Sequence, residues 1–174
     1  MNSEIRKIKN KINSLVKDKK ILDVVLFGSA IKGKVNPNDI DLALITNKKT
    51  NVRIEGFHIS MLDPIDFIDN PPTLITTLLR EGYSLKNDRP FSEKFRFISK
   101  VLYIYKLNNL SASKKVKTVR FLRGDKRNKG IVEKYKGEWL SNQVFILPIE
   151  ADNTLERFFT YNSINFTKKY ILIH

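Results

Sequence analysis

Residues 24–46 read VVLFGSAIKGKVNPNDIDLALIT, and this stretch decides the fold. Its apolar, β-branched start, VVLF, is typical of a buried strand, which Gly28 and Ser29 end. The closing part, DIDLALIT, alternates strictly and predicts a second strand. Because alternate residues of a strand face the same way, Asp39 and Asp41 share one face of it. The stretch therefore predicts two core strands, with a turn after the first and paired acids on the second.

This arrangement resembles the signature of the DNA polymerase β-like nucleotidyltransferase superfamily. That signature is an apolar strand, Gly-Ser, a spacer, and then Asp-apolar-Asp on the next strand; the spacer here is residues 30–38. Neither Gly-Ser nor Asp-x-Asp is specific alone, and the resemblance depends on their combination with the two strands. It implies an α/β (α+β) fold, with a mixed sheet flanked by helices, over residues 1–105.

The predicted chemistry is metal-dependent transfer of a nucleotide. Two carboxylates on one face repel each other unless a cation lies between them, and Mg²⁺ prefers such oxygen ligands. Asp39 and Asp41 are therefore the candidate metal ligands and catalytic acids, and an NTP is the expected substrate. A glycine turn allows close approach of backbone amides to phosphate oxygens, and lysines can neutralise phosphate charge. The nucleotide-binding candidates are Gly28, Ser29, Lys32 and Lys34.

The superfamily normally supplies a third carboxylate from a following strand. Here that strand reads GFHISML, and its inward positions, His58 and Ser60, are not acids. Three alternatives are open. In the first, a bulge at Gly56 brings Glu55 or Asp63 into the site. In the second, His58 replaces the catalytic base. In the third, the domain binds nucleotide or metal without catalysis. A lone histidine can also be an ordinary core residue.

Composition narrows the class of protein. The 174 residues carry a net charge of +14, which favours polyanionic partners, RNA above all. The absence of cysteine excludes disulfides and thiolate metal sites. The N-terminal stretch has no apolar signal core, and no run of residues is apolar enough to span a membrane. We expect a cytoplasmic protein without membrane contact.

A second domain is expected after a small, polar segment, residues 108–113. The chain is predicted to form a nucleotidyltransferase-like domain over 1–110 and a small, basic C-terminal α/β module over 111–174. Apolar spacing predicts an amphipathic helix over 92–106, at the end of the first domain. The later helices and strands of the module resemble no family that we recognise.

The most basic part of the chain is residues 114–136, which hold ten Lys or Arg against Asp125 and Glu133. Several of these cations are about three residues apart, so they could share a helix face, and a flexible loop between Gly124 and Gly130 would carry others. Together with nearby aromatic residues they predict contacts with a nucleic-acid backbone. The alternative is a solvated helix face. The nucleic-acid-binding candidates are Lys114, Lys117, Arg120, Arg123, Lys126, Arg127 and Lys129.

Two functions are consistent with these features. The first is an enzyme that moves a nucleoside monophosphate from an NTP to a hydroxyl of RNA, a ribonucleoprotein such as the ribosome, a protein side chain or a small molecule. The second is a catalytically degenerate domain that binds RNA or a ribosome. The signature favours the first, and the missing third acid favours the second.

Overall fold

The chain divides into two compact units in the computed structural model, which describes residues 3–32, 39–48 and 51–174. The units are Met1–Ile98 together with His174, and Ser99–Ile173. The division falls earlier than the expected boundary after residue 110. The physical reason is that residues 98–106 form a strand of the second sheet, so all of them but Ile98 group with the second unit.

The first unit contains a five-stranded mixed sheet in the order β3-β2-β1-β4-β5. β1 pairs antiparallel with both β2 and β4, whereas β2 and β3 are parallel. Its elements are α1 (Ser3–Lys11), α2 (Asn13–Lys17), β1 (Asp23–Phe27), the 3₁₀ turn η1 (Gly28–Ala30), β2 (Ile40–Ile45), β3 (Phe57–Leu62), η2 (Pro64–Phe67), α3 (Thr73–Glu81), β4 (Tyr83–Ser84), β5 (Arg89–Pro90) and η3 (Phe91–Phe95).

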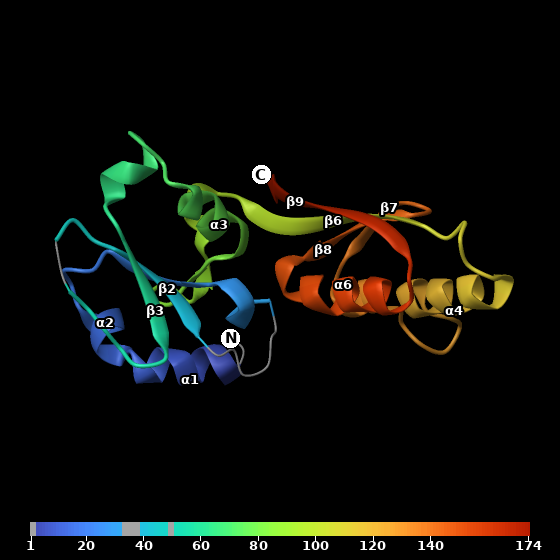
Figure 1. Ribbon diagram of the computed structural model, residues 1–174, viewed down its shortest axis with the longest axis horizontal. Helices are drawn as coiled ribbons and strands as arrows, with labels where there is room; N and C mark the ends of the chain where they lie inside the picture. The colour runs from blue at the N-terminus through green and yellow to red at the C-terminus, as the bar shows by residue number, and fades with distance from the viewer. Residues whose placement is uncertain (1–2, 33–38, 49–50) are drawn as a thin grey trace. The chain divides into compact units, whose positions relative to one another are not determined.

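Helices cover both faces of this sheet, as Figure 1 shows for α1 and α2 on one side and α3 on the other. Leu42 and Leu44 of β2 are buried against α1 and α2. Ala43 and Ile45 alternate with them and are buried in a second cluster with residues of α3 and η3. The predicted alternation of β2 is therefore confirmed, and Asp41 belongs to the α3 side of the sheet.

The second unit has a four-stranded sheet in the order β7-β8-β6-β9, with α4 and α6 on one side of it (Figure 1). Its core is rich in aromatic rings, and Tyr103, Phe145 and Phe159 are among the residues with no exposed surface. The elements are β6 (Ile98–Lys106), α4 (Ala112–Arg123), α5 (Ile131–Lys134), β7 (Glu138–Ser141), β8 (Val144–Pro148), η4 (Ile149–Ala151), α6 (Asp152–Tyr161) and β9 (Asn165–Ile173).

The predicted helix over 92–106 is wrong. The chain instead makes the short 3₁₀ turn η3, adopts a left-handed conformation at Arg96 (φ +61°) and continues as β6. Val101, Tyr103 and Tyr105 alternate on the buried face of β6, with a period of two rather than 3.6. Aromatic and β-branched side chains at this spacing pack better on a sheet than on a helix.

The ends of three helices are well defined. α3 ends at Gly82, and α4 is capped by Ser111, whose side chain accepts a hydrogen bond from the Lys114 amide (3.5 Å). The N-cap residue of α6 is Ala151. Over the described residues, no helix is both long and apolar enough to cross a membrane.

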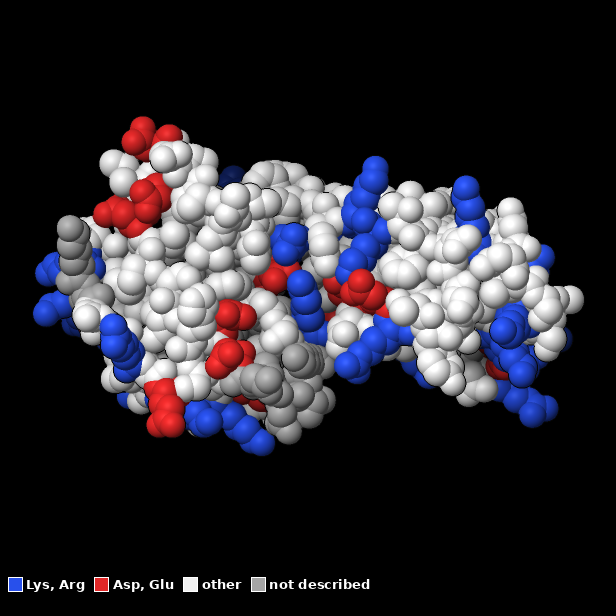
Figure 2. Space-filling view, in the orientation of Figure 1, with Lys and Arg blue, Asp and Glu red and all other residues white. Residues whose placement is uncertain are grey.

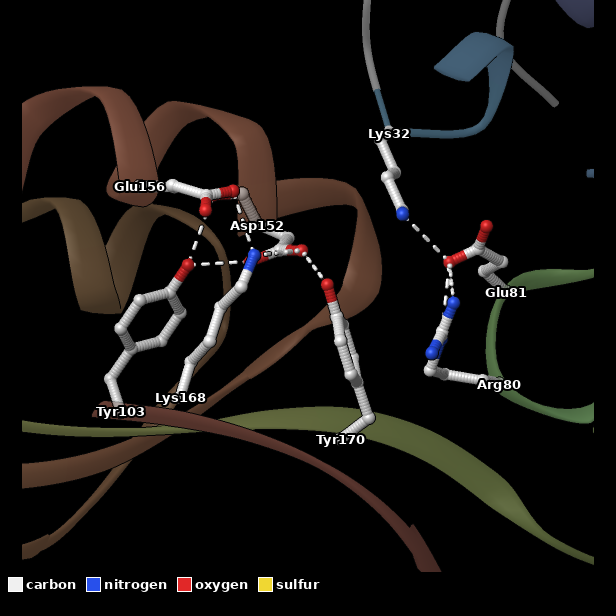
Figure 3. A network of polar contacts seen from close by, with 8 residues as sticks. All are labelled: Lys32, Arg80, Glu81, Tyr103, Asp152, Glu156, Lys168 and Tyr170. Atoms are coloured by element: carbon white, nitrogen blue, oxygen red, sulfur yellow. Dashed lines mark hydrogen bonds and ion pairs between the residues drawn. The ribbon is translucent and has the colours of Figure 1, made fainter. Parts of the chain in front are cut away.

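A buried polar network ties three elements of the second unit together (Figure 3). Asp152, at the start of α6, is 1% exposed and accepts hydrogen bonds from the hydroxyls of Tyr103 on β6 (2.5 Å) and Tyr170 on β9 (2.6 Å). Lys168 of β9 pairs with Asp152 (3.1 Å) and Glu156 (2.7 Å). Burial alone would raise the pKa of Asp152, but these hydrogen bonds and the lysine charge outweigh it and hold the pKa below its usual value.

Candidate active site

The turn after β1 brings the backbone close to a carboxylate of β2. Gly28 has φ +75°, and a Cβ built on it would lie 2.4 Å from Asp41 Oδ2, well inside van der Waals contact. Any other residue at this position would be strained by the positive φ and would displace the Asp41 side chain. Gly28 thus lets the turn after β1 pass directly against the Asp41 carboxylate.

The two acids of the signature lie at the start of β2. Asp41 pairs in register with Phe27 of β1 on one side and His58 of β3 on the other. Its side chain is 31% exposed, so it borders solvent at the edge of the core. Asp39 directly precedes β2 and is exposed. This donor set, carboxylate oxygens open to solvent, suits Mg²⁺ if substrate oxygens complete the coordination.

His58 occupies the neighbouring position on β3. Its Nδ1 lies 3.3 Å from Asp41 Oδ1, and its side chain is 70% exposed. The alternative of an ordinary core histidine is therefore wrong. When Nδ1 donates to the Asp41 carboxylate, Nε2 is left as an acceptor that faces solvent.

The other candidates for a third acid lie elsewhere. β2 and β3 pair without interruption from Ile40–Phe57 to Ile45–Leu62, so no bulge shifts a residue into the site. Asp63 follows the far end of β3, roughly 16 Å along the strand from His58, where it caps η2. Glu55 is exposed in the turn before β3. Among the residues that the structure places, no three His, Asp or Glu side chains are close enough to hold a metal ion.

Of the two lysine candidates in the spacer, the structure describes only Lys32. Lys34 lies outside the described residues. Lys32 Nζ is 2.9 Å from Glu81 Oε2, and Arg80 reaches the same oxygen at 3.1 Å (Figure 3). The Glu81 side chain is only 2% exposed, so this carboxylate is a buried anchor for the residues that follow the glycine turn. The sequence offers only a weak signal for Glu81, an acid in the last turn of a helix, where the helix dipole disfavours it.

The basic candidates of the second unit border two hollows. Lys117, Arg120 and Lys129 line one of about 340 Å³ beside Phe121, and Lys114 and Lys117 line a smaller one of about 70 Å³. Arg123 lies apart from both hollows, with its guanidinium 3.8 Å from the centre of the Trp139 ring. Figure 2 shows several Lys and Arg side chains on the surface at the end of the second unit where α4 lies, among uncharged residues.

The loop between Gly124 and Gly130 is closed by hydrogen bonds rather than hinged. Asp125 Oδ1 accepts from the backbone amides of Arg127 (2.9 Å) and Asn128 (3.0 Å), and Gly124 and Lys129 form a β-bridge. These contacts lower the pKa of Asp125, chiefly through the Arg127 amide. The loop therefore holds Lys126 and Arg127 exposed on a defined backbone.

Comparison with known proteins identifies the first unit. Residues 10–90, which span β1 to β5, match the family model described as Polymerase beta, Nucleotidyltransferase. A search of the curated proteins and a search of the solved structures each found no significant match. The match covers the glycine turn, Asp39, Asp41 of β2 and His58 of β3. Residues 10–90 of this chain are therefore a nucleotidyltransferase domain of the polymerase β family.

Proposed function

We propose that the chain is a magnesium-dependent nucleotidyltransferase that moves a nucleoside monophosphate from an NTP to a hydroxyl acceptor, with RNA or a ribonucleoprotein as the acceptor. The observation that carries the proposal is the contact between Gly28 and the Asp41 carboxylate inside a polymerase β-type domain. It supports the proposal because the turn that would bind phosphate lies against the carboxylate that would hold the metal.

The residues divide into two roles. The amides of Gly28 and Ser29, with the Ser29 hydroxyl, bind triphosphate oxygens, and Lys32 assists where it exchanges Glu81 for phosphate. Asp39 and Asp41 would hold Mg²⁺, which supplies Lewis-acid stabilisation of the attacking and leaving oxygens when bound.

In the transfer step, the acceptor hydroxyl oxygen bonds to the α-phosphorus while the bond to the bridging oxygen breaks and pyrophosphate leaves. His58 Nε2 receives the hydroxyl proton. Asp41 fixes the orientation of the ring through Nδ1, so His58 takes the place that a third carboxylate holds elsewhere in the family.

The test is transfer of label from each of the four α-labelled NTPs to RNA, with Mg²⁺ and the full chain. Asp39→Asn and Asp41→Asn should each lower transfer at least a hundredfold, because each loses a charged metal ligand. Asp69→Asn is the matched control, an exposed acid of the same unit outside the site. Absence of transfer by the wild type, or equal transfer by all variants, would contradict the proposal.

A second candidate is a binding module without catalysis, and one observation favours it: His58 and Ser60 stand where an acid is expected. The two candidates differ in one readout. A binding module predicts salt-sensitive RNA binding, without transfer, that survives loss of Asp39 and Asp41.

A further inference from the structure

The strongest unassigned feature lies in the second unit, around a pair of stacked rings. Phe121 of α4 and Phe158 of α6 stack with centroids 3.9 Å apart and planes 16° apart. The larger hollow borders Phe121, the smaller one borders Phe158, and Lys117 lines both. The ring pair therefore stands between two hollows, and Phe121 is still 36% exposed.

The larger hollow is strongly cationic. Lys117, Arg120, Lys129 and Lys134 line it against a single acid, Asp125. Asp125 Oδ1 accepts hydrogen bonds from backbone amides of its own loop, and Asp125 Oδ2 lies 3.6 Å from Arg120 Nε. Lys129 pairs with Glu133 (2.7 Å), whereas Lys117 and Lys134 have no acidic partner in the described part of the chain.

This chemistry suits a ligand that has both a flat ring and a phosphate. The exposed part of Phe121 offers a stacking surface for a base, and the lysines offer charge for phosphate oxygens. A volume of about 340 Å³ lies within the range of small-ligand pockets.

The cations continue beyond the hollow, which favours a chain over a free nucleotide. On α4, Lys114, Lys117 and Phe121 are three and four residues apart and share one stripe of the helix, and Lys114 reaches the smaller hollow. Lys126 and Arg127 are exposed on the closed loop. A free nucleotide is too small to contact all of these cations, whereas a polynucleotide presents a phosphate at every nucleotide along its length.

We propose that the two hollows beside Phe121 and Phe158 bind single-stranded nucleic acid, with one base stacked on Phe121 and its phosphates on Lys117 and Lys134. The proposal rests on the proposed transferase function and deepens it, because it names a single strand as the acceptor class. It assigns affinity to backbone and stacking contacts, so it predicts little sequence specificity.

The experiment measures fluorescence anisotropy of labelled 12-nucleotide RNA and DNA strands with the full chain. EDTA is present and NTP is absent, so binding does not depend on transfer. Lys117→Gln combined with Lys134→Gln should weaken binding at least tenfold and reduce the salt slope by about 1.4, since each single-strand contact contributes about 0.7. Lys106→Gln combined with Lys169→Gln is the control. It removes the same charge from exposed positions of the same unit that line neither hollow, and it should change the affinity less than threefold.

Two further arms test the ligand and the ring. Phe121→Ala should weaken binding roughly fivefold or more while leaving the salt slope unchanged. A duplex of the same sequence should bind at least tenfold more weakly than either strand. The proposal is overturned if the two lysine pairs change the affinity equally or if the duplex binds as tightly as the single strands. It is also overturned if free ATP competes for the site as well as an unlabelled strand does. Binding that persists in Asp41→Asn separates this site from the transferase.

Discussion

At the scale of single residues, the position of Gly28 carries most of the active-site argument. Two independent features require glycine at this position. Its φ is +75°, and a Cβ built on it would lie 2.4 Å from Asp41 Oδ2. One concerns backbone strain, and the other concerns the position of the Asp41 carboxylate, the proposed metal ligand. A substitution with a suitable control can separate them.

We predict that Gly28→Ala lowers transfer at least tenfold, because a displacement of about 1 Å in a catalytic group can reduce a rate by about a hundredfold. It should also lower the free energy of unfolding by roughly 1–3 kcal/mol through strain at positive φ. Urea unfolding and labelled-NTP transfer, measured on the same preparation, check the two effects.

Gly56→Ala is the matched control. Gly56 has nearly the same φ, +76°, but nothing lies within 4 Å of a Cβ built on it. It should show a similar loss of stability from strain and retain transfer at the wild-type rate. If both variants lose transfer equally, the contact between Gly28 and Asp41 has no special role.

These residues also show how far sequence reasoning reaches. Gly28, Asp39 and Asp41 could be predicted because their spacing and the strand periodicity lie within one short stretch. The pairing of Lys32 with Glu81 could not, because α3 approaches the spacer only after the sheet has formed. The exposure of His58 could not be predicted either, since periodicity gives the face of a strand on which a residue lies but not its depth of burial.

At the scale of elements, β6 shows why the spacing of apolar residues can predict a helix where a strand forms. Phe95, Ile98, Val101, Leu102 and Tyr105 fit a helical spacing, but Val101, Tyr103 and Tyr105 fit a strand equally well. Long-range pairing with β8 decides between them. That pairing depends on residues about 45 positions away, which a local pattern does not contain.

The network around Asp152 holds β6, α6 and β9 together, so it predicts a measurable stability effect. Asp152→Asn should lower the free energy of unfolding of the second unit by roughly 3 kcal/mol, because it leaves buried donors without a charged acceptor. Trp139 is the only tryptophan and packs on Phe145 at 5.0 Å, so its fluorescence in urea reports this unit. Glu150→Gln, an exposed acid nearby, should have no effect.

The same network sets a pH dependence. The pKa of Asp152 is lowered on folding, so its contribution is complete above its unfolded pKa, about 4, and is lost as pH falls through the folded value. Burial alone would lower the pKa of Lys168, but its hydrogen bonds and acidic neighbours raise it, so its contribution persists up to the unfolded pKa and is lost as pH rises through the folded one. The cost of Asp152→Asn should therefore be constant between about pH 5 and 9 and shrink below pH 4; a cost that grew with acidity would contradict this account.

At the scale of the whole molecule, the chain joins a polymerase β-type domain to a unit whose cations surround an aromatic pair. Each unit has its own sheet and its own core. We therefore expect each to respond to its own ligand, since a ligand stabilises only the cooperative unit that binds it.

Hydrogen exchange followed by mass spectrometry tests this expectation segment by segment on the full chain. Mg²⁺ with a non-hydrolysable ATP analogue at about 100 times its Kd should raise the opening free energy of amides in β1 and β2 by up to about 2.7 kcal/mol. Amides of α4 should not change. A single-stranded oligonucleotide should protect α4 and the loop that follows it, and leave β1 and β2 as they were. Protection of both units by the ATP analogue alone would mean that they unfold as one body, and the two sites would then have to be treated as thermodynamically coupled rather than separate.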